Sequence, residues 1–510
     1  MIKSYKKASY VLILVSLVFR LLIATTIEFG NDEVYYWLYA LQPDISHFDH
    51  PPMIGFFIQL CTFDLYFNSE LWIRLAAIIP SAISMLLVYK ITNLIAGSKA
   101  GFFSVCLYQL SIYGLLISGL FVLPDAPMNL FWLLAVFCFI KPLIENAATE
   151  NYLRLLLGFF FAGCAIYSKY QAVYLLLGVG LYVLLYNRSW LKASVLYLGF
   201  LLSFFFVGLI VYWNYQNDFI SFGFHSNRVS LFSLNFKSAS FIREVIGQVL
   251  YNNPYVVFVI IVAIRFFYRN NTFITKKQLS FFLIFSLPLI LTVLYLSLYK
   301  DTLPHWSGIA YLTLLPIAGS YLSTRNIKKN HLIFGNVFFA GVILIAVGVV
   351  NLGWLLPVDQ NNELTKVGKD DVTLDMFGWK ETSLGLKKIL MENEEYSELP
   401  FLLHKWYPAS HLHYYFIAAE GLQYIPLGKI EDTHKYYWSN PENKIVPEEA
   451  LFVVDSRNYK DPKELFGKYY KEIQLLETLP VFRSGVVVKN VFVYYLKDKK
   501  NSLENSNEFL

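Results

Sequence analysis

The stretch GNDEVYYWLYALQPDISHFDHPPM, residues 30–53, follows directly on an apolar run from Tyr10 to Ile27. That run is near the length needed to cross a hydrocarbon core of ~30 Å. Six acidic residues occur from Glu28 to Asp64, and no Lys or Arg lies between Arg20 and Arg74. Because cytoplasmic loops of membrane proteins carry the excess of Lys and Arg, this loop is expected on the opposite side.

The composition is that of a multi-pass membrane protein. The chain has 510 residues, of which 56% are hydrophobic and 15% charged, whereas soluble proteins have roughly 25% charged residues. No small-residue cleavage site follows the first apolar run, so it is not expected to be a cleaved signal. The net charge of +5 is spread along the chain, and nucleic acid is therefore not an expected partner.

We expect about eleven membrane spans, with boundaries uncertain by a few residues. Their predicted ranges are 9–27, 72–90, 101–120, 124–142, 155–168, 170–187, 191–213, 251–268, 279–299, 304–322 and 332–356. Lys169 separates the fifth and sixth ranges, which are therefore either two spans or one broken helix.

Basic residues mark every second connection, as in 90–99, 188–192 and 325–329. This pattern places the N-terminus in the cytoplasm. Loop 28–70, the LPDAP turn, Lys169, loop 214–250 and the YKDTLPHW stretch are then external. An odd number of spans puts the tail from Pro357 on the external side as well.

The tail, 357–510, is rich in Lys, Glu, Asp, Asn and Tyr. The runs ALFVVD (450–455) and GVVVKNVFVYYL (485–496) predict strands, and 382–392 predicts a helix. We therefore expect a core of 1–356, with juxtamembrane helices in 28–70, and a small external α/β domain over 357–510.

Asp32 and Glu33 come directly after the first span, where carboxylates are costly to bury. One interpretation makes one of them a general base for an acceptor group or a ligand for a cation. The alternative is that they cap a helix that begins near Asn31.

The HFDHPPM stretch places Asp49 and His50 before two prolines. The prolines fix the backbone and can open the helix that MIGFFIQL predicts. His50 could then complement a phosphate or shuttle a proton, although a Pro-Pro pair is also an ordinary turn signal. In LPDAP, Asp125 is interpreted as a metal ligand, a hydroxyl acceptor or a helix cap.

Three cations, Lys169, Arg228 and Lys300, lie on the predicted external side. An anionic phosphate at the membrane surface would account for the set. Each cation taken singly could instead extend its charged group into water or pair with the acidic loop. His305 and Trp306 follow closely and could stack on a sugar ring or line the cavity.

Taken together, N-D-E after the first span, F-D-H-P-P before a surface helix, and P-D between spans three and four resemble the C-type glycosyltransferase superfamily. The likeness is to the protein O-mannosyltransferase and lipid A aminoarabinose transferase group. PHW and the later DMFGW (375–379) are similar to bacterial glycosyltransferases of family 39. The resemblance implies a multi-helix membrane core with a C-terminal external domain, in a bacterial inner membrane.

The resemblance also implies a reaction and roles for residues. The donor would be a sugar on a polyprenyl phosphate such as undecaprenyl phosphate, and transfer would invert the anomeric carbon. The acceptor would be a glycolipid such as lipid A, a polysaccharide or a protein, met among membrane lipids. Asp32, with Glu33 beside it, matches the catalytic acidic site. Asp49 and His50 match the acid–base pair, Asp125 an acidic site, and Lys169 a residue that meets the donor phosphate.

The sequence does not specify the substrates or a metal. The aminoarabinose enzymes have Glu-Lys where this chain has Asp49-His50, so the sugar and the acceptor are not specified. If a divalent metal assists, Asp49 and Asp125 are its candidate ligands. The competing class is a transporter or flippase for polyprenyl-linked glycans, which would typically show internal repeats and charged or broken helices near the bilayer midplane.

Overall fold

The computed structural model describes residues 2–145, 149–229, 236–270, 273–356 and 363–500. These form two compact units, one of Met1–Ala24 and Tyr39–Val342 and the other of Thr25–Leu38 and Ile343–Leu510. The second unit thus includes the segment that follows the first apolar helix. The predicted domain border after residue 356 adjoins 357–362, which lie outside the described residues, and it stays a prediction.

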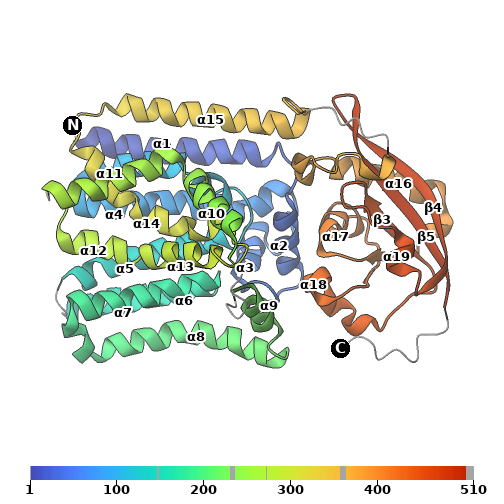
Figure 1. The fold of residues 1–510 in the computed structure, drawn as a ribbon, viewed down its shortest axis with the longest axis horizontal. Coiled ribbons are helices and arrows are strands. Elements are labelled where there is room, and N and C mark those ends of the chain that lie inside the picture. The colour runs from blue at the N-terminus through green and yellow to red at the C-terminus, as the bar shows by residue number, and fades with distance from the viewer. Residues whose placement is uncertain (1, 146–148, 230–235, 271–272, 357–362, 501–510) are drawn as a thin grey trace. The chain divides into compact units, whose positions relative to one another are not determined.

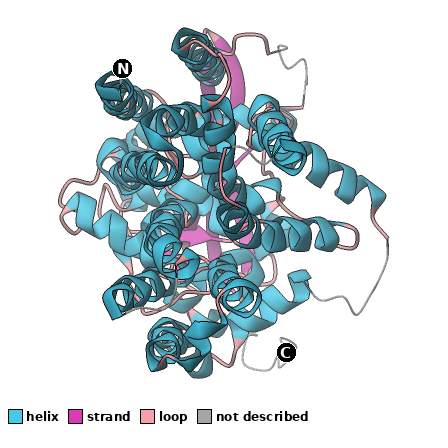
Figure 2. Cartoon of the chain, turned by 90° about the vertical axis from the view of Figure 1, so that its left-hand side faces the viewer, coloured by secondary structure: helices cyan, strands magenta, loops and turns pink. Residues whose placement is uncertain are grey.

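The first unit is a bundle of apolar helices, many of which Figure 2 shows end-on. Its helices are α1 (Ile2–Ala24), α3 (Met53–Thr62), α4 (Glu70–Leu110), α5 (Asp125–Ile144), α6 (Tyr152–Ile166), α7 (Tyr174–Tyr186), α8 (Ser194–Gln216), α9 (Ile220–Val229), α10 (Ser238–Tyr251), α11 (Pro254–Asn270), α12 (Lys276–Ile284), α13 (Leu287–Ser297) and α14 (Gly308–Ser323). Along the chain, α2 (Asn31–Leu41) and α15 (Lys329–Leu352) run from one unit into the other. The short helices α2 and α3 fall within 28–70.

Each predicted span coincides with an apolar helix or helix pair, as expected where backbone polar groups must be satisfied without water. The second and third spans are joined in α4, which breaks at Gly97, where φ is +82°. The fifth and sixth are separate helices, α6 and α7, with Lys169 and a 3-10 turn (Tyr170–Val173) between them. At the break, the Lys169 N–H donates to the Ala165 carbonyl at 3.0 Å and the Lys169 carbonyl accepts the Ala172 N–H at 3.0 Å.

The chain is a multi-pass membrane protein. Among the described residues, six helices are long and apolar enough to cross a membrane, or seven if α10 and α11, which meet at 91°, form one span. The expected total of about eleven spans stays a prediction. Helices such as α8 and α15 expose apolar side chains, for example Leu201 and Phe338, as a lipid-facing surface would.

Arg20, inside the first span, is buried, and the structure identifies its partners. Its Nε donates to the carbonyl of Leu115 at 3.1 Å and its Nη2 to that of Gly114 at 3.2 Å. These carbonyls belong to a π-helical turn, Tyr113–Ile117, whose wider winding leaves acceptors available. The guanidinium therefore fixes α1 against the turn that also carries Tyr113.

The second unit contains a five-stranded sheet of order β2-β1-β3-β5-β4. Its elements are β1 (Phe401–Leu403), β2 (Tyr424–Pro426), β3 (Ala450–Asp455), β4 (Tyr470–Arg483), β5 (Val486–Lys499), α16 (Trp379–Glu392), α17 (Trp406–Leu412), α18 (Ile430–Thr433) and α19 (Pro462–Phe466). β1 is parallel to β2 and β3, whereas β5 is antiparallel to β3 and β4. This confirms the predicted small α/β domain.

The β4–β5 hairpin shows how local sequence sets the register of the sheet. Arg483 pairs with Val486, so only Ser484 and Gly485 form the turn. Both have positive φ, 52° and 82°, as in the tight turn whose twist matches that of the flanking strands.

Candidate active site

The centre of the first-unit site is a buried ion pair between Lys169 and Asp125. The Lys169 ammonium donates to Asp125 Oδ2 at 2.6 Å, and the two side chains are 6% and 2% exposed. The Tyr113 hydroxyl donates to Asp125 Oδ1 at 3.2 Å. Because an unpaired buried charge is costly, these contacts compensate the Lys169 ammonium and fix its orientation.

His305 joins this pair from another part of the chain. It lies in the 3-10 turn Pro304–Ser307 before α14, close enough to Lys169 and Asp125 for their charges to act on it. The Gln171 amide donates to the carbonyl of Trp306 at 2.8 Å. The turn after Lys169 is thereby tied to the turn that carries His305.

Asp49 and His50 lie close to the same turn. The Tyr39 hydroxyl donates to Asp49 Oδ1, and His225 Nε2 donates to the Asp49 carbonyl at 2.8 Å. The His50 ring lies 6.1 Å from that of His225 and 6.4 Å from that of Tyr170, centroid to centroid. Tyr170 directly follows Lys169. His50 comes just before α3 and His225 lies in α9, and Figure 1 shows both helices at one end of the bundle.

Lys300 and Arg228 are the remaining predicted cations. The Lys300 carbonyl accepts a hydrogen bond from the Ser240 hydroxyl at 2.8 Å, at the end of α13. The side chain of Arg228, in α9, lies outside the described residues. The first unit therefore brings together five of the predicted residues: Asp49, His50, Asp125, Lys169 and His305.

Asp32 and Glu33 belong to the second unit, at the start of α2. Glu33 is buried, and its Oε2 accepts a hydrogen bond from the Gly30 N–H at 3.1 Å. Asp32 is exposed and close enough to Tyr407 to interact with it electrostatically. The capping interpretation therefore fits Glu33, whereas Asp32 has the exposure that a base for an incoming acceptor needs.

The segment before Asp32 is held by residues that sequence reasoning missed. The half-buried Glu28 carboxylate accepts the backbone N–H groups of Trp379 at 2.7 Å and Lys380 at 3.1 Å, where α16 begins. Burial raises the pKa of Glu28, and these two hydrogen bonds oppose the rise. Next to Asp32, His411 Nε2 donates to Asn31 Oδ1 at 2.9 Å.

His411 is itself packed tightly. Its ring stacks on Trp379 with centroids 4.1 Å apart and planes at 6°. The DMFGW motif, which contains Trp379, was the sequence signal for this segment. Nothing in the sequence indicated that Trp379 contacts Glu28 or His411.

Metal binding by Asp49 and Asp125 stays a prediction. Among the described ranges, no three His, Cys, Asp or Glu side chains are grouped so as to hold a metal ion. Both oxygens of Asp125 already accept hydrogen bonds, from Lys169 and Tyr113.

Comparison with known proteins relates this geometry to a family. A family model described as dolichyl-phosphate-mannose-protein mannosyltransferase matches residues 49–213. No curated protein matches by sequence. ArnT from Cupriavidus metallidurans bound to undecaprenyl phosphate is 13% identical over 95% of this chain and 97% of that chain, with a TM-score of 0.60. Its apo state is 11% identical over the same shares, with a TM-score of 0.58.

The likeness to ArnT shows the fold, which is that of the C-type glycosyltransferases. The matched range 49–213 includes Asp49, His50, Asp125 and Lys169. The family-model match over residues 49–213 and the shared fold agree with the predicted resemblance to this superfamily.

Proposed function

We propose that the protein is an inverting glycosyltransferase of a bacterial inner membrane. It moves a sugar from a polyprenyl phosphate, such as undecaprenyl phosphate, to a glycolipid, polysaccharide or protein on the external face. The observation that carries this proposal is the buried Lys169–Asp125 pair beside His305. Such a site suits an anionic leaving group that must be stabilised where water is scarce.

In this proposal, Lys169 binds the phosphate of the donor. An ammonium has three N–H donors, and Asp125 accepts one of them. The others are available to phosphate oxygens as charge-assisted hydrogen bonds. Asp125 acts through Lys169, since its hydrogen bond fixes the direction of the ammonium. His50 and His305 are further donors near this position, and Arg228 and Lys300 remain predicted phosphate contacts.

Asp32 is the residue for the acceptor. In the transfer, an acceptor oxygen attacks the anomeric carbon while the bond from that carbon to the phosphate oxygen breaks. The Asp32 carboxylate takes the proton of the acceptor, and the bonding electron pair leaves with the lipid phosphate. One displacement of this kind inverts the anomeric carbon. Glu33, whose carboxylate accepts the Gly30 N–H, stabilises the start of the helix that carries Asp32.

An apolar groove in the first unit supports a lipid-linked donor. It has a volume of about 440 Å³ and is lined mainly by α3 and α4, including Phe57, Leu60, Trp72 and Ile83. α3 begins three residues after His50. Such a groove suits an isoprenoid chain, whose burial is favourable per unit of apolar area.

The test is sugar transfer by Asp32→Asn, reconstituted in vesicles with a polyprenyl-phosphate sugar. We expect transfer to be abolished and membrane insertion to be unchanged. Asp64→Asn is the matched control, because Asp64 lies in the same acidic loop, where its exposed Oδ1 accepts a hydrogen bond from Gln59 Nε2 at 3.1 Å. Wild-type turnover by Asp32→Asn would remove Asp32 from the mechanism. Movement of the donor across the vesicle without its consumption would instead indicate a transporter.

The acceptor class is found by mass analysis. Envelope glycolipids, polysaccharides and glycoproteins from a deletion strain would be compared with those of the parent strain. The class that loses a sugar residue, and regains it when the wild-type protein is restored, is the acceptor.

A further inference from the structure

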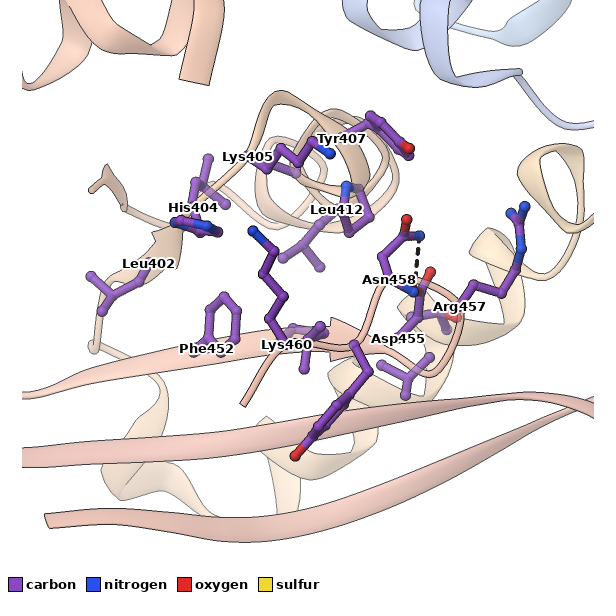
Figure 3. Close-up of a pocket in the computed structure, with 18 of the residues that line it drawn as sticks. Leu402, His404, Lys405, Tyr407, Leu412, Phe452, Asp455, Arg457, Asn458 and Lys460 are labelled. Carbon is purple, nitrogen blue, oxygen red and sulfur yellow. Dashed lines mark hydrogen bonds between the residues drawn. The ribbon is translucent and has the colours of Figure 1, made fainter. Parts of the chain in front are cut away.

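The second unit contains a cavity of about 250 Å³ between the sheet and α17. Its walls include Leu402, His404, Lys405, Tyr407, Phe452 and Lys460. Figure 3 shows His404, Lys405 and Lys460 toward one side of this space and Asp455, Asn458 and Arg457 toward the other. The proposed transfer chemistry uses none of these residues.

One side of the cavity carries positive charge that the fold does not neutralise. Within the described part of the chain, neither Lys405 nor Lys460 has a carboxylate within salt-bridge distance. Lys405 Nζ lies 5.0 Å from the centroid of the Tyr407 ring. Both ammonium groups act electrostatically on His404, as does Asp432 with the opposite sign. An anionic group is therefore the complement of this side.

The other side of the cavity carries an ion pair and a buried carboxylate. Arg457 forms an ion pair with Asp375. Asp455 is buried, and its Oδ1 accepts the N–H of Asn458 at 2.8 Å and the Asn458 amide at 3.0 Å. This side consequently presents a buried carboxylate oxygen, Asp455 Oδ2, that accepts no hydrogen bond from the described residues. It suits hydroxyl groups of a ligand rather than a second charge.

The middle of the cavity is apolar and aromatic. Leu402, Leu412 and Phe452 line it, and Tyr407 adds a ring beside Lys405. Such walls suit the C–H faces of a sugar ring, while convergent polar groups fix its orientation. A ligand that joins one anionic substituent to a hydroxylated ring matches all three parts.

The cavity also lies near the proposed base. Tyr407 lines it, and the adjacent Trp406 packs against Tyr35 of α2, the helix that carries Asp32, with ring centroids 5.2 Å apart. We propose that this cavity binds a sugar ring of the acceptor that carries a phosphate or a carboxylate. Binding there would hold an acceptor hydroxyl for Asp32. This inference rests on the proposed function, since only a transferase has an acceptor.

Binding is tested by calorimetry on the full-length protein in nanodiscs, with glucose 1-phosphate and glucuronate as probes. We expect at least one of them to bind, and glucose and inorganic phosphate each to bind at least about tenfold more weakly, because each lacks one of the recognised parts. Lys405→Met and Lys460→Met should each weaken binding about tenfold, the worth of one charge-assisted hydrogen bond.

Lys388→Met is the matched control, since this exposed lysine pairs with Glu392 away from the cavity, and it should bind as the wild type does. Thermal unfolding confirms that each variant is folded. Absence of binding by the wild-type protein would overturn the inference, as would unchanged binding by both lysine variants. Inorganic phosphate binding as tightly as glucose 1-phosphate would show an anion site without sugar recognition and would also overturn it.

Transfer assays separate this inference from the proposed function. Asp32→Asn should retain probe binding while transfer is lost, whereas Lys405→Met should raise the acceptor KM and leave kcat unchanged. If Asp32→Asn transfers sugar normally, the proposed role of Asp32 fails whatever the cavity binds. If the probes bind but Lys405→Met and Lys460→Met leave the acceptor KM unchanged, the cavity is not the acceptor site.

Discussion

The Lys169 ammonium donates a 2.6 Å hydrogen bond to the Asp125 carboxylate inside the first unit. The two residues are 44 positions apart in the chain, and both side chains are nearly inaccessible to water. A buried pair of this kind contributes little net stability, because desolvation offsets the attraction, yet losing one partner leaves an uncompensated charge. The pair is therefore better explained by the chemistry of a phosphate leaving group than by stability.

A double variant separates the two explanations. Asp125→Leu should lower the free energy of unfolding by about 3–5 kcal/mol, because Lys169 loses its buried partner. Lys169→Met/Asp125→Leu should recover most of that loss, since both charges are then absent. Transfer should remain abolished in the double variant. Thermal unfolding in detergent and the transfer assay measure the two effects, and near-normal transfer by the stable double variant would contradict the role of Lys169.

His411 is predicted to position Asp32 through Asn31. His411→Phe keeps a ring to stack on Trp379 but removes the donor to Asn31 Oδ1. We expect kcat to fall about tenfold with the acceptor KM unchanged, together with a loss of about 1 kcal/mol in stability. His331→Phe, at an exposed position, is the control. Kinetics over a range of acceptor concentrations distinguish the outcomes, and a change in KM alone would assign His411 to binding.

Buried histidines make the stability of the second unit depend on pH. Burial lowers the pKa of His413 from its ordinary value of 6.5 to about 4 and lowers that of His411 as well. Between pH 6.5 and 4 the unfolded chain therefore binds more protons, so stability falls as the pH is lowered through this range, by up to about 1.4 kcal/mol per pH unit for each histidine.

Melting temperatures at pH 7.5, 6 and 5 test this dependence. His413→Phe should flatten the slope, because the titrating group is removed. A melting temperature that is constant from pH 7.5 to 5, or an equal slope in the variant, would contradict the assignment.

Filling the apolar groove should weaken binding of the donor. Ile83→Trp places a larger side chain in the groove between α3 and α4 and should raise the donor KM several-fold, since an isoprenoid chain loses part of its apolar contact. The acceptor KM should not change. Leu184→Trp, at an exposed position of α7, is the control, and equal effects of the two substitutions would show that the groove is not specific.

The predicted topology is tested with reporters. A fusion after Glu363 should report the external side, and one after Lys329 the cytoplasmic side, because the connection before α15 is basic. A cytoplasmic signal after Glu363 would place the second unit, and Asp32 with it, on the wrong side for a flipped lipid donor.

The local sequence pattern was sufficient to predict a helix or strand wherever a single physical requirement determined its structure. Apolar runs became helices because a bilayer leaves no alternative for their backbone polar groups. β3 occupies the predicted range 450–455, since a run of this kind suits a strand buried in a sheet. β1 and β2, with three residues each, were missed because such short strands depend on their neighbours. β4 was missed because charged residues such as Glu472 and Glu477 interrupt its apolar pattern.

By itself, the sequence determined the membrane helices, the folded tail and the candidate residues for acid–base and phosphate chemistry. Only the tertiary structure decided that Asp125 meets Lys169, and it added a contact that the sequence did not indicate, between His411 and Asn31. It also decided that Thr25–Leu38 folds with the C-terminal unit. The physical reason is that hydrophobic burial is non-directional, so the order of apolar residues along the chain is enough to predict it. A hydrogen bond instead requires two specific atoms to meet at one distance and angle.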